Sequence, residues 1–337
     1  MPQVDREQEM HAMNASLRAL LEGIIDYAGL FPPAKLPLNQ AIHNYAKYRD
    51  GAERWILGRF ICPAARLSEV APFVEELFES GPSLVISALG RGGSNAGEFT
   101  AGVRADAADI QSLRERYHGR VIVDAYETRL PPAVTAPADA AAIKPLLGQA
   151  AAALSAFSAP SISIACEVAP AKEWRRAWDA SIHAIADARA RATPSAVNFG
   201  FKWRAGGLEA AAFPSPEQVA FIIAACRDHA VPWKATAGLH DPFRHFDETL
   251  KTSMHGFLNV FTAGVLAAAR RLNRATIQAI LEDQEPDHFR FDDHAVHWKD
   301  VSGSTEEVAA ARRQSALSFG SCSFEEPIDH LRRRGWI

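Results

Sequence analysis

The sequence has few cysteines, no long apolar run and no excess of charge of one sign. The closest two of its four cysteines, Cys166 and Cys226, are 60 positions apart (226 − 166). This spacing argues against a disulfide framework or a cysteine metal site, and we expect the reduced thiols of a cytoplasmic protein. No apolar run reaches the roughly 18 residues of a membrane-spanning helix. The polar stretch Met1–Met13 does not resemble a signal peptide.

The balance of charges bears on the kind of partner. Lys and Arg number 36 against 40 Asp and Glu, which gives a net charge of −4. Proteins that bind nucleic acid usually carry a strongly basic surface, so this balance argues against that partner. Hydrophobic residues make up 48% of the 337 residues, enough for a large core. We therefore expect a small-molecule ligand, with neither nucleic acid nor a membrane as partner, and homo-oligomerisation stays open.

What the sequence does contain is an alternation of short apolar runs with Ala-rich stretches of helical character. The runs start 24 to 41 residues apart, and a strand with its crossover helix needs about 30 residues. Strands that alternate with helices form a parallel sheet, and eight of them favour a (β/α)8 TIM barrel over a doubly wound open sheet. The eight predicted strands are Ile24–Tyr27, Trp55–Cys62, Leu84–Leu89, Val121–Glu127, Ile162–Val168, Val197–Arg204, Pro232–Gly238 and Gly256–Phe261.

The pattern changes after Arg271, where acids, histidines and aromatics replace the regular alternation. We therefore predict two parts. Residues 1–272 form the (β/α)8 barrel with an N-terminal helix, and residues 273–337 form a mainly helical C-terminal extension packed on the barrel.

Two predicted strands direct lysines toward the interior of the barrel. In the sixth, alternation places Phe199, Phe201 and Trp203 on one face. Helices cover the outside of a barrel, so this aromatic face should point outward, and Lys202 and Arg204 should then point inward. The same argument turns Lys234 inward on the seventh strand. Neighbouring strands lie about 5 Å apart, so the two lysines should share one space.

Buried lysines are rare unless they are paired or functional, and both explanations fit here. As core ion pairs, Lys202 and Lys234 would bind Glu167 and Glu127. As a nucleophile, Lys202 would need its pKa to fall by about three units, or roughly 4 kcal/mol, to be neutral at pH 7. A neighbouring ammonium group and burial together can supply that shift.

The stretch Phe199–His240 contains FGFKWRAGG, then SPEQV, then VPWKATAGLH. It resembles the end of the barrel in class I aldolases of the deoxyribose-phosphate aldolase type. The resemblance implies that Lys202 forms a Schiff base with the substrate. It also implies that Lys234, in its Lys-Ala-x-x-Gly context, tunes the first lysine. The resemblance covers about 40 of the 337 residues.

Other polar groups at predicted strand ends complete the candidate site, because barrel active sites lie at the carboxyl ends of the strands. Glu167 is a candidate general acid or base, and on the fourth strand alternation leaves a choice between Asp124 and Glu127. Arginines beside glycine-rich loops suggest an anionic substrate. The candidate substrate-binding residues are Arg204, Arg91, Gly206, Gly207, His240, Asn259 and Asp26.

Three functions follow from these residues. The leading hypothesis is a cofactor-free, Schiff-base-forming lyase that acts on a small anionic carbonyl compound. The second is a divalent-metal isomerase or lyase that uses Glu127, Glu167 and His240 with Asp26 or Asp241. The third is a non-catalytic barrel with a binding role. Cys322, in the small-residue segment near the end, either reaches the mouth of the barrel or is a buried, inert thiol.

Overall fold

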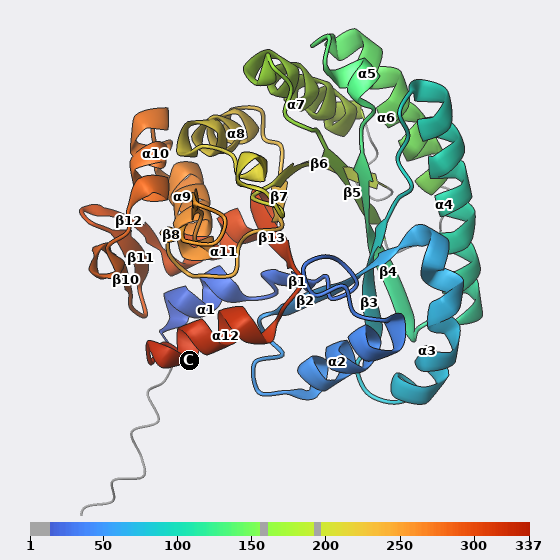
Figure 1. Cartoon of the computed structure of the whole chain (residues 1–337), viewed down its shortest axis with the longest axis horizontal. Helices are drawn as coiled ribbons and strands as arrows, with labels where there is room; N and C mark the ends of the chain where they lie inside the picture. Colours follow the sequence, from blue (N-terminus) through green and yellow to red (C-terminus); the bar gives the residue numbers. More distant parts are fainter. Residues whose placement is uncertain (1–13, 156–160, 192–196) are drawn as a thin grey trace, which may run out of the picture.

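A closed barrel of parallel strands forms the centre of the protein (Figure 1). The computed structural model describes residues 14–155, 161–191 and 197–337, so the segment Met1–Met13 lies outside the described residues. The closed sheet confirms the predicted (β/α)8 barrel and excludes the doubly wound alternative. In spatial order the strands are β1 (Ile25–Tyr27), β13 (Ala316–Ser321), β7 (Trp233–Thr236), β6 (Val197–Arg204), β5 (Ile162–Glu167), β4 (Val121–Arg129), β3 (Leu84–Leu89) and β2 (Leu57–Pro63).

Helices surround the barrel, as Figure 1 shows. Several begin at side-chain caps: Asn95 accepts a hydrogen bond from the Glu98 amide, and Ser215 forms a capping box with Gln218. The α-helices are α1 (Ala15–Leu21), α2 (Leu38–Asp50), α3 (Ala71–Leu77), α4 (Ala96–Arg116), α5 (Pro132–Thr135), α6 (Ala140–Leu154), α7 (Trp174–Arg191), α8 (Pro216–Asp228), α9 (Phe257–Arg270), α10 (Arg274–Glu282), α11 (Thr305–Gln314) and α12 (Glu325–Arg333). Short 3₁₀ helices are η1 (Ala64–Val70), η2 (Ala210–Ala212) and η3 (Pro286–His288).

Two small antiparallel sheets interrupt the alternation after β7. Strands β8 (His245–Asp247) and β9 (Thr252–Met254) form a hairpin. Strands β10 (Phe289–Phe291), β11 (Ala295–Trp298) and β12 (Val301–Ser304) form a three-stranded sheet beside α1 at the periphery of the molecule (Figure 1). These insertions separate β7 from β13 along the chain, although the two strands are neighbours in the barrel.

The eighth strand is not where the sequence pattern predicted it. Residues Gly256–Phe261 belong to the start of α9, so that prediction is wrong. Every residue from Phe257 to Ala267 is buried, and periodicity alone cannot distinguish a short apolar run in a buried helix from a buried strand. The eighth strand is β13, which pairs with β1 and β7. Residues 273–337 therefore supply part of the barrel, and the boundary predicted at 272 cuts through it.

The outer face of the barrel is aromatic where β6 and β7 meet the helices. Phe199, Phe201 and Trp203 are buried, and the rings of Trp203 and Trp233 lie 6.1 Å apart. Packing these large rings outward turns the alternate positions of both strands inward, as predicted. Across the described residues, no helix combines the length and the apolar character that a membrane crossing requires.

Candidate active site

An alternating chain of positive and negative side chains fills the interior of the barrel. It contains four carboxylates and four cations, so its formal charges cancel. We call these eight residues the interior ion-pair network. In order of contact they are Asp124, Arg59, Asp26, Lys234, Glu127, Lys202, Glu167 and Arg204.

Glu127 on β4 is the centre of this network. Its Oε1 lies 2.6 Å from Lys234 Nζ, and its Oε2 lies 2.8 Å from Lys202 Nζ. Lys202 also contacts Glu167 Oε2 at 2.9 Å, and Lys234 contacts Asp26 Oδ2 at 2.7 Å. The two lysines face each other in register on β6 and β7. Each lysine is therefore held between two carboxylates, as the ion-pair explanation of the sequence required.

Serine hydroxyls bring the two remaining strands into the network. Ser87 on β3 donates a hydrogen bond to Glu127 Oε1 at 2.7 Å, and Ser318 on β13 donates one to Asp26 Oδ2 at 2.7 Å. With these two, all eight strands contribute a polar side chain to the interior. The closure of the barrel and the neutralisation of its interior charges thus depend on the same contacts.

The pairing determines the charge states of the central residues. Burial by itself would lower the pKa of Lys202, but Glu127 and Glu167 outweigh that effect and raise it. Burial would likewise raise the pKa of Glu127, and the two lysines instead hold it well below its ordinary value. The expected depression of the Lys202 pKa by Lys234 is therefore wrong for the free protein. Charged lysines and charged carboxylates stabilise each other here.

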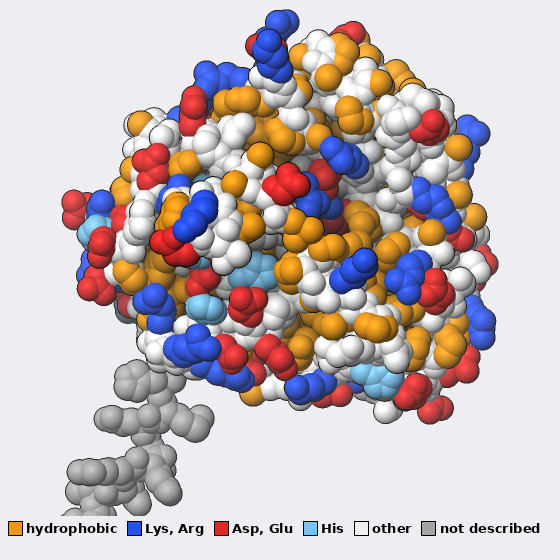
Figure 2. Space-filling model, viewed as in Figure 1, with side chains coloured by type: hydrophobic (Ala, Val, Ile, Leu, Met, Phe, Trp, Pro, Cys, Tyr) orange, Lys and Arg blue, Asp and Glu red, His pale blue; other side chains and the backbone are white. Residues whose placement is uncertain are grey.

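A cavity of about 740 Å³ opens onto one part of the network. Glu127, Lys202 and Arg204 line it, whereas Lys234 lies behind them and does not. Figure 2 shows acidic, basic and histidine side chains together around the hollow that lies over the barrel. Further lining residues come from the loops after β1 and β6, the segment after β7 with its β8–β9 hairpin, and the residues after β13; they include Phe31, Pro32, Gly207, His240, Asp241, His245, Leu250 and Cys322. The two lysines thus share the network, and only Lys202 reaches the cavity.

Some predicted site residues lie elsewhere. Arg91 pairs with Asp106 and Asp109 on α4 and does not line the cavity. Asn259 is fully buried on α9, where it accepts from the Arg244 amide and donates to backbone carbonyls. These two side chains fix local structure, because their polar atoms are used by neighbouring segments. Gly206 lies against Phe213 and Gly238. Of the two predicted glycines, Gly207 lines the cavity.

On β4, both Asp124 and Glu127 belong to the interior ion-pair network, which simple alternation does not predict. The register between β3 and β4 shifts after Ile86, which adds one residue on β4. Glu127 therefore binds the lysines, while Asp124 binds Arg59 Nε at 2.6 Å in the same network. Tyr126 points outward, where its hydroxyl donates to Asp106. A bulge changes the phase of alternation, so both acids join the interior.

Several residues of the site were not recognised in the sequence. Arg59 and Ser87 are not among the candidate site residues, because single polar residues in apolar strands are common. Ser318 was overlooked because β13 was not recognised as a strand. One signal could have found it: Ser304 and Glu307 form a capping box that starts α11, and Ala316–Ser321 follows as the next strand.

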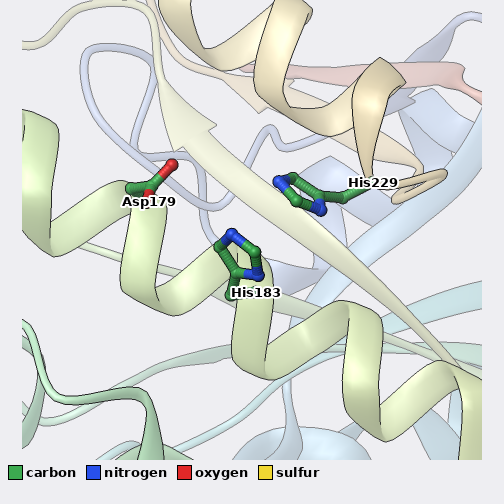
Figure 3. Close-up of side chains that lie close together, drawn as sticks. All are labelled: Asp179, His183 and His229. Carbon is green, nitrogen blue, oxygen red and sulfur yellow. The ribbon is translucent and has the colours of Figure 1, made fainter.

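Among the described residues, one group of three histidine and aspartate side chains has the spacing of a metal site, and it lies outside the barrel. Asp179 and His183 on α7 and His229 at the end of α8 place a ligand atom each within 4.8 Å of one another. Figure 3 shows the two imidazole rings close together, and their centroids lie 4.0 Å apart. This set could hold a divalent transition metal such as Zn²⁺. The carboxylates predicted for a metal, Glu127 and Glu167, instead bind the two lysines and Arg204.

Comparison with known protein families gives no match to the chain, and no curated protein matches its sequence. The class that the fold and the site define is a (β/α)8 barrel with a buried lysine–carboxylate network beside a cavity. The geometry of this network and cavity is therefore the basis for assigning a function.

Proposed function

We propose that the protein is a Schiff-base-forming carbon–carbon lyase, similar to class I aldolases, that acts on a small anionic carbonyl compound. One observation carries the proposal: Lys202 lines the cavity while its Nζ lies 2.8 Å and 2.9 Å from two carboxylates. An amine that can pass its proton to a neighbouring carboxylate can attack a bound carbonyl carbon. The resemblance of residues 199–240 to two-lysine aldolases supports the same assignment.

The ion pairs define how the amine would become reactive. Lys202 is protonated in the resting protein because the carboxylates raise its pKa. Glu167 Oε2 is close enough to take that proton when a substrate enters. The free amine then bonds to the carbonyl carbon, and the carbonyl electron pair moves to oxygen. That oxygen takes one proton from Glu167 and one from the attached nitrogen and leaves as water, which gives the protonated Schiff base.

Arg204 supports the anionic character of the substrate. Its side chain is 49% exposed, it lines the cavity, and its Nη1 lies 3.9 Å from Glu167. A half-exposed guanidinium beside the reactive amine is suited to a carboxylate or phosphate.

The four cysteines are free thiols, which supports a reducing, cytoplasmic setting for the reaction.

Borohydride trapping tests the proposal. The protein is incubated with a panel of aldehydes and 2-keto acids, reduced with borohydride, and mapped by peptide mass spectrometry. We expect an irreversible adduct on Lys202. Its yield should rise with pH above neutrality, since the ion pairs keep this amine protonated at neutral pH.

Lys202→Arg is the matched variant, because arginine keeps a positive charge for Glu127 and Glu167 without a nucleophilic amine at these pH values. We expect this variant to lose the adduct and Lys234→Arg to retain it. Exposed Lys251 reports background labelling. Adduct yields on Lys202 no greater than on Lys251 across the panel would overturn the proposal. Turnover that is lost with EDTA and restored by a divalent metal would favour the metal-dependent alternative instead.

A further inference from the structure

Cys322 differs from the other cysteines in its surroundings. It follows β13 directly and lines the same cavity as Lys202. All four thiols are buried, but Cys322 keeps 9% exposure where the others have at most 1%. Burial raises the pKa of Cys62 and Cys166 to about 12. Of the four thiols, Cys322 is the one beside an imidazole in the cavity wall.

His240 and Glu326 complete a linear arrangement with this thiol. His240 follows β7, the neighbour of β13 in the barrel, and its Nε2 lies 3.9 Å from Cys322 Sγ. Its Nδ1 lies 2.8 Å from Oε2 of Glu326 on α12. An ionised carboxylate only accepts hydrogen bonds, so Nδ1 donates to it and Nε2 is left to take the thiol proton. A nucleophile, a base and an acid that orients the base recur in this order in thiol enzymes.

The electrostatics agree with this geometry. Burial alone would lower the pKa of His240, but contact with Cys322 and Glu326 outweighs it and raises the pKa to about 8. An imidazole that holds a proton at neutral pH stabilises a thiolate beside it. His240 is therefore placed to hold a proton in the wall of the cavity, next to the Cys322 sulfur.

We propose that Cys322, His240 and Glu326 form a second nucleophilic site of the cavity, in which the Cys322 thiolate adds to an aldehyde. The choice of an aldehyde rests on the proposed lyase function, because aldol cleavage releases an aldehyde. The reactivity of the thiol is independent of that function. The sulfur bonds to the carbonyl carbon, and the carbonyl electron pair moves to oxygen. His240 gives its proton to that oxygen, which yields a thiohemiacetal without any oxidant. Reversal of these steps releases the aldehyde.

Alkylation rates test the activation of the thiol. The folded protein is treated with iodoacetamide at pH 7, and modification of each cysteine is followed by peptide mass spectrometry. We expect at least a tenfold fall in the Cys322 rate in His240→Gln and a several-fold fall in Glu326→Gln. His330→Gln is the control, since His330 pairs with Asp241 instead. Equal rates in His240→Gln, Glu326→Gln and His330→Gln, with all three variants folded, would overturn the proposal.

Protection by an aldehyde tests the ligand class separately from the lysine. Propionaldehyde should slow alkylation of Cys322 in the wild type and equally in Lys202→Arg. Protection that disappears in Lys202→Arg would show that occupancy of the lysine shields the thiol, and would overturn aldehyde addition to Cys322. Protection that persists where borohydride traps nothing on Lys202 would support the thiol site while the lyase proposal fails.

Discussion

Glu127→Leu should lower the free energy of unfolding by about 3–5 kcal/mol, because it leaves two buried ammonium groups without their shared carboxylate. Lys202 and Lys234 are 3% and 6% exposed, so water replaces little of the lost partner. Chemical denaturation monitored by tryptophan fluorescence measures the change. Glu248→Gln removes an exposed ion pair with Lys251 and should cost about 0–1 kcal/mol.

The same variant in a background without the lysines separates the ion pairs from packing. In a Lys202→Met/Lys234→Met protein, Glu127→Leu should cost much less, because no uncompensated ammonium remains. A double-mutant cycle gives the coupling energy directly. If the Glu127→Leu penalty is the same in both backgrounds, the penalty comes from lost packing, and the ion pairs of Glu127 with the two lysines do not stabilise the barrel.

The effect of Glu127 should also depend on pH, and the sign follows from its pKa. The lysines hold the pKa of Glu127 below its ordinary value of roughly 4.3. Its contribution is therefore complete above that pH and decreases as the pH falls below it. The stability gap between the wild type and Glu127→Gln should be constant from pH 6 to 8 and narrow toward pH 3. Lys202 has a raised pKa, so its contribution is complete below roughly 10.4 and lost as the pH rises through its folded-state pKa.

Alternation was sufficient to place the two lysines, because large aromatic residues marked the outer face of β6 and β7. Phe199, Phe201 and Trp203 cannot point into a filled barrel interior, so the intervening residues must do so. The same local rule could not show which carboxylate each ammonium meets. That choice depends on the register between strands far apart in sequence, and it reversed the expected direction of the Lys202 pKa shift.

Two elements, helix α9 and strand β13, were not predicted correctly from the alternation of apolar runs, and each has a physical reason. Helix α9 is buried from Phe257 to Ala267, and a short apolar run at its start cannot be assigned to a helix or a strand from periodicity alone. Strand β13 is rich in small residues, and the hairpin and three-stranded sheet separate it from β7 along the chain. The predicted C-terminal extension therefore included Ser318 and Cys322, which lie in the network and at the cavity. Closure of a barrel is a long-range property that no local window contains.

Arg312 on α11 makes that closure testable, because its guanidinium ties β13 to the start of the barrel. It is buried and donates to the backbone carbonyls of Leu20 and Glu22 at 2.7 Å and 3.0 Å, and to those of Ala316 and Leu317. Arg312→Met removes every one of these donors and should cost at least about 3 kcal/mol in the free energy of unfolding.

Arg312→Lys should recover only part of this loss, since a lysine cannot reproduce the planar fork of five donors. The neighbouring Arg313 is exposed, so Arg313→Met should leave stability within about 0.5 kcal/mol of the wild type. Hydrogen exchange locates the effect: in Arg312→Met, amides of β1 and β13 should lose protection before those of β4 and β5. If protection falls uniformly in all strands, Arg312 contributes to global stability but does not specifically stabilise the pairing of β1 with β13. If amides of β1 and β13 instead lose protection first, Arg312 stabilises the pairing of β13 with β1 that closes the barrel. Residues 273–337 are then essential to the fold.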